Sequence, residues 1–325
     1  MPIYKTGNIL HYFQDLDNRN FQEIQRSQIY EEKEKLERLF NDSSDTVFIP
    51  AGRNLITLLS SQLNYIFTTL EEPQLRNIDY VTRKYTEYIL KIKPSFREGL
   101  EGLRERYLDF ADLDGGKTRN KQTIHLLIKQ AKEILNGTYR CADGEDRLYI
   151  NDGSYVKINF ASSGQQEIVW VLNLLLYCHL YNKKTFLILE EPETHLYPET
   201  QRLVAEMLSV FRGEEENSML ITTHSPYILG SFNNMLLAGQ LVEPTTEEPV
   251  KKLLHKKTWL KPDGFLAYHV QKGSIKDALD RDGNLTLINN YLIDGAAEKI
   301  NSINDAILSA QAVAGPENNK MEKNK

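Results

Sequence analysis

The stretch Thr185-Phe-Leu-Ile-Leu-Glu-Glu-Pro-Glu-Thr-His-Leu-Tyr-Pro-Glu199 decides the fold class of this chain. Its four consecutive apolar residues, Phe186 to Leu189, predict a strand that is buried on both faces of a parallel sheet. The strand ends at two carboxylates, Glu190 and Glu191, which are costly to keep there unless the site uses negative charge. A hydrated Mg²⁺ beside a nucleotide is the usual reason for such a pair. The alternative interpretation is an acidic loop exposed to solvent.

The composition excludes several classes of protein. The chain has 325 residues, 41% of them hydrophobic, which is enough for one large domain or two small ones. Its net charge of −6 gives no global basic field, so binding to nucleic acid would need a local basic patch. Its two cysteines, Cys141 and Cys178, form neither a metal motif nor a disulfide framework, which predicts a reducing, cytoplasmic setting. We find no apolar stretch long enough to span a membrane.

Strands and helices alternate after residue 160. The apolar stripe of 200–212 predicts a helix, and Ser218 to Thr223 predicts the next strand. Such alternation predicts parallel strands joined by crossover helices. Before it, 147–160 reads as a hairpin with an Asn-Asp-Gly turn, and 77–136 is mostly helical.

We therefore predict an α/β fold with a mostly parallel sheet, a helical insertion and a mixed C-terminal extension. The predicted segments are an N-terminal helical segment (1–45), a strand with the helical insertion (46–137), an α/β core (138–230), the extension (231–312) and a disordered tail (313–325).

A second motif is Ala161-Ser-Ser-Gly-Gln-Gln-Glu167, which precedes a strongly apolar helix. Ser162 or Ser163 can cap that helix, and Gln165 or Gln166 can complete a capping box. Gly164 would let the backbone approach an anion at the positive end of the helix. A helix that is capped without binding phosphate is an equally good interpretation of this motif alone.

A third motif is Leu220-Ile-Thr-Thr-His-Ser-Pro226, in which another apolar strand ends at His224. A neutral imidazole there could hydrogen-bond a γ-phosphate or position a water, although a lone histidine at a strand end is more often structural. Gly164 lies 27 residues before Glu191, and His224 lies 33 residues after it. Each interval holds one helix and one strand, so all three motifs should meet at the carboxyl edge of one sheet, where open α/β sheets bind ligands.

Together these motifs resemble the ABC-type ATPases of the soluble RecF/SMC/OLD-like branch, which includes AAA family ATPases of bacterial antiviral defence. The segment 161–165 is similar to the signature motif, 186–192 to Walker B with the catalytic glutamate, and 193–198 to the D-loop. The resemblance implies a P-loop NTPase-like fold of ABC ATPase type, with ATP and Mg²⁺ as cofactors. The site residues that it implies are Glu190 for Mg²⁺, Glu191 as general base, His224 as γ-phosphate sensor, His195 in the D-loop, and Ser162, Ser163, Gly164 and Gln165 contacting ATP across a dimer interface. One departure is Glu190, where the wider superfamily usually has Asp.

The phosphate loop of such ATPases, Gly-x-x-x-x-Gly-Lys-Ser/Thr between a strand and a helix, does not occur in the sequence. A relaxed version, Ala111-Asp-Leu-Asp-Gly-Gly-Lys-Thr118, follows a charged helix over 103–110 instead of a buried strand. Its two aspartates would also repel phosphates. Either the loop belongs to a part of the ATPase that is absent from this chain, or this is a degenerate subunit that offers only its signature face to a partner.

The predicted function is an ATP-binding and ATP-hydrolysing core that dimerises with ATP and acts on a separate effector, for example a nuclease. Its partner would be a second copy or another ATPase chain, and hydrolysis by this chain alone should be weak or absent. The alternative is a catalytically inactive scaffold that keeps the fold. Arg53, just after the predicted strand at 46–50, has two open interpretations: a side chain that reaches phosphate or nucleic acid, and a surface arginine in a turn.

Overall fold

A computed structural model describes residues 43–58, 62, 69, 79–114, 119–151, 153–181, 184–213, 217–282 and 285–314. Residues Thr46–Lys325 form one compact unit, which is the part considered below. Residues 1–42 of the predicted N-terminal helical segment, the loop residues 115–118 and the tail after 314 lie outside the described residues. The predicted segment boundaries stay predictions.

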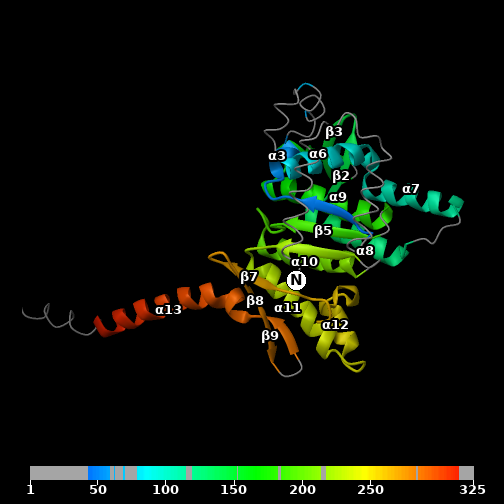
Figure 1. Ribbon diagram of the computed structural model, residues 1–325. Helices are drawn as coiled ribbons and strands as arrows, with labels where there is room; N and C mark the ends of the chain where they lie inside the picture. Colours follow the sequence, from blue (N-terminus) through cyan, green and yellow to red (C-terminus); the bar gives the residue numbers. More distant parts are fainter. Residues whose placement is uncertain are drawn as a thin grey trace, which may run out of the picture. The chain divides into compact units, whose positions relative to one another are not determined.

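A three-stranded parallel sheet stands at the centre of the fold, in the order β1 (Asp45–Ile49), β5 (Thr185–Glu190), β6 (Ser218–Thr222) (Figure 1). Strands β5 and β6 run parallel, and Glu190 pairs with Thr222 at their carboxyl ends. The helix α10 (Pro198–Arg212) connects them, as the alternating pattern predicts. The chain therefore has the α/β fold of the P-loop NTPase-like type that the sequence predicts.

The prediction that β5 is buried on both faces is wrong in one respect. Leu187 and Leu189 are buried, whereas Phe186 and Ile188 on the other face are only partly covered. On the neighbouring strand β6, Leu220 is 48% exposed. Among the described residues, one face of the sheet thus packs into the core more completely than the other. A continuous apolar run does not reveal this asymmetry, because it depends on the elements that cover each face.

The buried helix α9 (Ser163–Tyr181) forms the middle of the main core. It packs against α8 (Lys121–Leu135), which also packs against α10. The Trp170 ring of α9 makes edge contacts with Phe96 and Tyr139, at centroid distances of 5.9 and 5.2 Å. One apolar core therefore joins α8, α9 and α10 to residues that precede them in the chain, such as Phe96.

The expected helical stretch 77–136 contains α6 (Tyr80–Ile92), the short 3₁₀ helix η2 (Lys93–Phe96), α7 (Gly99–Asp114) and α8. A buried ion pair of 2.8 Å between Lys93 Nζ and Asp146 Oδ2 ties η2 to the neighbouring antiparallel sheet.

That sheet has the order β2 (Thr138–Ala142), β3 (Glu145–Asn151), β4 (Ser154–Lys157). The predicted hairpin corresponds to β3 and β4, but its second strand ends at Lys157, and 158–160 form the 3₁₀ helix η3 (Ile158–Phe160). The strand β2 was not predicted from the sequence. Its alternation is weak, since only Tyr139 in it is fully buried.

The C-terminal part is built on α11 (Pro226–Leu241), which carries a second, smaller apolar core. Two side-chain amides of α11 bind the backbone of β10 (Leu285–Ile288). The Asn233 amide hydrogen-bonds the backbone N–H and C=O of Ile288, and the Gln240 amide hydrogen-bonds the backbone N–H and C=O of Thr286. The other elements are α12 (Glu247–Leu253), η4 (Lys256–Thr258), β7 (Tyr268–Gln271), β8 (Ser274–Asp277), β9 (Leu279–Asp282) and α13 (Asn290–Ala314), while α3 (Asn54–Leu58) follows β1. No helix among the described residues has both the length and the apolar composition to cross a membrane.

Candidate functional site

Two carboxylates lie at the carboxyl end of β5, where the sequence places them. Glu190 is half-buried, and its Oε2 accepts a 3.1 Å hydrogen bond from the backbone N–H of Ala51. Glu191 follows the last strand residue with φ of 42°, a left-handed conformation that is costly for any residue with a Cβ. Its backbone N–H donates to Thr222 O at 2.9 Å, so the pairing of the two strands holds this conformation.

His224 lies at the same edge of the sheet. Its Nε2 is 3.8 Å from Glu191 Oε1, and its side chain is 89% exposed while that of Glu191 is 40% exposed. The loop after β5 fixes its backbone, because Glu193 Oε1 accepts the His224 N–H at 2.7 Å. Thr194 Oγ1 lies within hydrogen-bonding distance of Glu191 O and Oε2, at 2.9 and 3.3 Å. The structure thus brings Glu190, Glu191 and His224 to one open edge, as the spacing predicts.

The signature-like segment begins α9 with a capping box. Gln165 N donates to Ser162 Oγ at 3.3 Å, and Ser162 N donates to Gln165 Oε1 at 3.1 Å. Gln165 Nε2 also donates to Leu135 O at 2.7 Å. Of the caps that the sequence allows, Ser162 with Gln165 is the one that forms, which leaves Ser163 exposed in the first turn.

Gly164 has a steric reason to be glycine. A Cβ at this position would lie 2.7 Å from the carbonyl oxygen of His195, closer than real Cβ contacts occur. The start of α9 therefore touches the D-loop-like segment directly. His195 itself has φ of 59°, a second left-handed residue in this loop.

Arg53 joins these pieces from inside the protein. Its side chain is completely buried, and its guanidinium donates to Glu190 O at 2.6 Å and to Glu191 O at 3.0 Å. Its Nε donates to Glu167 O at 3.2 Å. Both interpretations in the sequence analysis, a phosphate- or nucleic-acid-binding arginine and a surface arginine, are therefore wrong. The guanidinium serves as a planar set of donors for backbone carbonyls.

Glu167 is the acidic partner of Arg53, and sequence reasoning missed it. Glu167 Oε2 accepts the Arg53 backbone N–H at 3.0 Å and lies 3.4 Å from Arg53 Nε. Its other oxygen, Oε1, is 3.7 Å from His195 Nδ1. A carboxylate within a strongly apolar helix was the signal that could have revealed it, because such a group is seldom buried without a partner.

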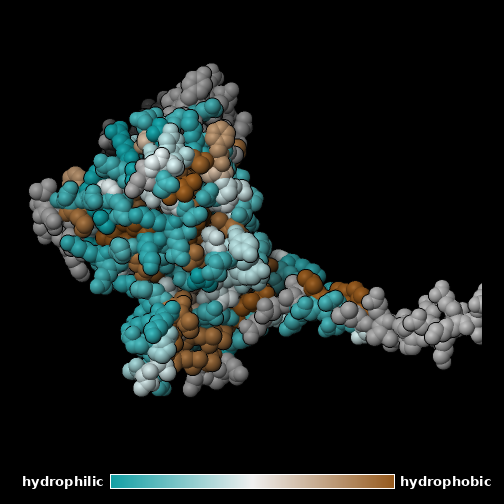
Figure 2. Space-filling view, turned by 180° about the vertical axis from the view of Figure 1, so that it is seen from behind, coloured by the Kyte–Doolittle hydropathy of each residue, from teal (hydrophilic) through white to brown (hydrophobic). Residues whose placement is uncertain are grey.

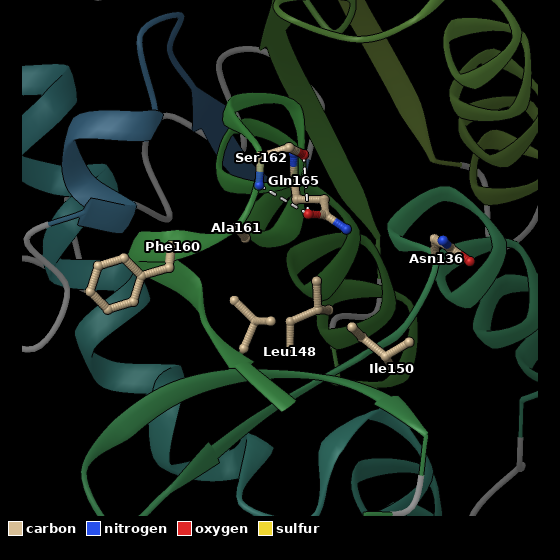
Figure 3. A pocket seen from close by; sticks show the side chains of 8 residues that line it. Asn136, Leu148, Ile150, Phe160, Ala161, Ser162 and Gln165 are labelled. Carbon is tan, nitrogen blue, oxygen red and sulfur yellow. Dashed lines mark hydrogen bonds between the residues drawn. The ribbon is translucent and has the colours of Figure 1, made fainter. Parts of the chain in front are cut away.

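A pocket opens beside the start of α9 (Figure 3). Leu148, Ile150 and Phe160 give it an apolar side, and Asn136, Ser162 and Gln165 a polar one. Phe160 is 76% exposed and Ile150 is 59% exposed, although both are large and apolar. The signature-like segment is thus flanked by apolar side chains at the surface.

The carboxylates at the β5 end fit a Mg²⁺ ion of the nucleotide-bound type. Among the described residues, no group of three or more His, Cys, Asp or Glu could hold a metal alone. Mg²⁺ at a nucleotide needs only one or two carboxylates, since water and phosphate supply the other ligands. Within the same described parts, neither Glu190 nor Glu191 is paired with Lys or Arg, because Arg53 binds their main-chain oxygens instead. Glu190 would hold the ion.

The parallel sheet thus carries acidic residues and a histidine at its carboxyl edge, beside a capped helix N-terminus, which is where open α/β sheets bind their ligands. A family model for the AAA ATPase domain matches residues 5–229, and the chain belongs to this family of nucleotide-binding ATPases. A search of curated proteins found no match.

Proposed function

We propose that this chain provides the hydrolytic face and the signature face of an ABC-type ATPase site. Glu190 would hold the Mg²⁺ of Mg²⁺·ATP, and Glu191 would accept a proton from the attacking water. His224 would donate a hydrogen bond to the γ-phosphate. The observation that carries this proposal is the 3.8 Å approach of His224 Nε2 to Glu191 Oε1 at an open sheet edge, next to Glu190.

The second half of the proposal concerns the signature-like segment. Ser162, Ser163, Gly164 and Gln165 would face ATP held by another chain, so that ATP binding joins two chains and hydrolysis separates them. The backbone contact between Gly164 and His195 supports this, because movement of the signature would be transmitted to the loop that bears Glu191. The family resemblance favours a separate effector, such as a nuclease, in antiviral defence.

The proposal requires a phosphate-binding loop from outside these 325 residues, since the sequence has no Gly-x-x-x-x-Gly-Lys-Ser/Thr. Backbone amides and a lysine around the β- and γ-phosphates supply most of the affinity in such sites. This chain alone should bind Mg²⁺·ATP weakly and turn it over at background rate. Lys117→Ala should change neither property; strong turnover that this substitution abolishes would instead assign the loop to 111–118.

Electron paramagnetic resonance can monitor the binding of Mn²⁺·ATP, and it tests the metal site without depending on turnover. Mn²⁺ replaces Mg²⁺ and reports its own immobilisation. The full chain at millimolar nucleotide should immobilise Mn²⁺, and Glu190→Gln should remove most of this signal. Glu243→Gln, an exposed glutamate after α11, is the matched control and should leave it unchanged. Equal signals from all three proteins would refute the assignment of Glu190.

The second candidate is a catalytically inactive scaffold, which the missing phosphate loop favours. Glu191→Gln separates the two functions once the chain is studied with the partner that supplies the loop. In an ATPase, this change should abolish turnover and accumulate ATP-bound dimers, because the water loses its proton acceptor. In a scaffold, turnover and assembly should both be unaffected.

A further inference from the structure

Helix α13, 25 residues long, carries an apolar stripe with a seven-residue repeat. Four positions are spaced by seven, and a further apolar residue follows each of the first three by three residues. These residues are Ile293, Ile300, Ile307 and Ala314, with Ala296, Ile303 and Ala310 between them. We call this set the α13 seam. A strict repeat of this kind averages 3.5 residues per turn, the period of helices that supercoil around each other.

Among the described residues, contacts of α13 with another helix are found with α11, near the beginning of the seam. A Cβ added at Gly230 of α11 would lie 3.9 Å from Ile293 Cγ2, which is ordinary van der Waals contact. The first turn of α13 therefore packs against α11. Farther along, Ile300, Ile303 and Ile307 are 67%, 53% and 58% exposed. Figure 2 shows brown, apolar surface along this helix. Apolar side chains that stay more than half exposed forgo burial free energy, so the stripe favours a partner that covers it.

The repeat indicates the kind of partner. A straight helix has 3.6 residues per turn, so a seven-residue repeat drifts around its surface by about 20° per heptad. The stripe stays in contact over three heptads only when the opposing surface is another helix that coils with it. An irregular groove would not need the strict repeat.

The residues that flank the seam indicate which helix is the partner of α13. The positions beside it are all uncharged except Lys299; the others are Leu292, Ala297, Asn304, Ala306, Gln311 and Val313. Of the three acidic residues of α13, Glu298 and Asp305 lie on the opposite side of the helix, and Asp294 occupies a position outside the seam and its flanks. Coiled coils choose a different partner through charges at the flanking positions, and like charges there prevent self-pairing. A neutral flank fits an identical copy of the same helix, since a two-fold interface places the same patch opposite itself.

We propose that α13 pairs with α13 of a second copy of the chain, through the α13 seam, and that it does so without nucleotide. Such a pair would hold two ATPase cores at high effective concentration, so that their meeting becomes an intramolecular event. The inference rests on the C-terminal helix alone and does not depend on the proposed ATPase mechanism.

The mass of the full chain in solution without nucleotide tests this proposal, by light scattering or sedimentation over a range of concentrations. The wild type should have twice the 37.5 kDa of one chain. Ile300→Asp with Ile307→Asp should give the single-chain mass, because it places two charges in the seam. Asn301→Asp with Ser309→Asp adds the same charge to exposed positions outside the seam and should stay dimeric. Far-ultraviolet circular dichroism and thermal unfolding verify that each variant is folded.

A disulfide experiment gives a second measurement. Ile303 lies midway along the seam, so both parallel and fully overlapping antiparallel pairs place it opposite itself. Ile303→Cys in a Cys141→Ser background should link two chains under mild oxidation, well above the yield of Asn301→Cys. A single-chain mass for the wild type, a dimer that needs ATP, an unchanged mass for the Ile300/Ile307 variant, or equal linking at 301 and 303 would each overturn the proposal.

Discussion

Arg53 and Glu167 form an ion pair that is removed from water, with side chains 0% and 1% exposed and 3.4 Å between Nε and Oε2. The same guanidinium holds the main-chain oxygens of Glu190 and Glu191. The start of α9 and the end of β5 are therefore joined through one side chain.

Arg53→Met should destabilise the protein by about 3–5 kcal/mol, because Glu167 would remain as a buried charge without its partner. Chemical denaturation measures this loss. Adding Glu167→Gln should recover only part of it, since the carbonyls of Glu190 and Glu191 still lack their donors. Lys84→Met breaks the exposed pair with Glu87 and is the matched control, expected to cost about 1 kcal/mol or less. Equal losses for the two single variants would contradict the role of the buried pair.

Gly164→Ala should cost about 1–3 kcal/mol, because the new methyl group would lie 2.7 Å from His195 O and force the two segments apart. Gly153→Ala provides the comparison, since a Cβ there meets no atom within 4 Å. Unfolding free energies of the two variants test the contact. If Gly164→Ala is as stable as Gly153→Ala, the close approach of Gly164 to His195 does not exist in solution.

Glu191→Gly should be more stable than Glu191→Ala by about 1 kcal/mol, because only glycine adopts a φ of 42° without strain. Both variants remove the carboxylate, so their difference isolates the backbone. At Glu105, in the middle of α7, the order should reverse, with glycine about 1 kcal/mol worse than alanine. Thermal unfolding of the four proteins compares the two sites, and the same order at both would argue against backbone strain at Glu191.

Acidification should weaken the fold through His255. Desolvation and the charges of Lys257 and Lys129 lower the pKa of His255 below its usual 6.5. The unfolded chain therefore takes up this proton first, and the stabilisation present above pH 6.5 is lost as the pH falls through the folded-state pKa. The geometry agrees, because His255 Nδ1 must be unprotonated to accept the Lys257 N–H at 3.2 Å.

His255→Asn keeps a side-chain acceptor and removes the titration. Stability of this variant should therefore depend less on pH between about 7.5 and 5 than that of the wild type, as denaturant midpoints at each pH would show. His269→Asn, in the exposed hairpin of β7 and β8, serves as the control histidine. Parallel pH curves for wild type and His255→Asn would rule out this contribution.

Much of the candidate site could be predicted from local patterns. Apolar runs that end in Glu190 and in His224 mark strands, and parallel strands bring their carboxyl ends to one edge. The capping box of Ser162 and Gln165 could also be predicted, because it depends on a spacing of three residues. The strand β2 was not, since its residues alternate too weakly and its pairing with β3 depends on a distant segment.

The chain by itself determined the alternation of strands and helices after residue 160, the edge at which the polar groups gather and the heptad repeat of α13, because each follows from spacing along the sequence. Only the tertiary structure decided that Arg53 is buried, that Glu167 is its partner and that Gly164 touches His195. These contacts join residues up to 138 positions apart, between Arg53 and Glu191. A side chain's surroundings then depend on how separate elements pack, which no local pattern specifies.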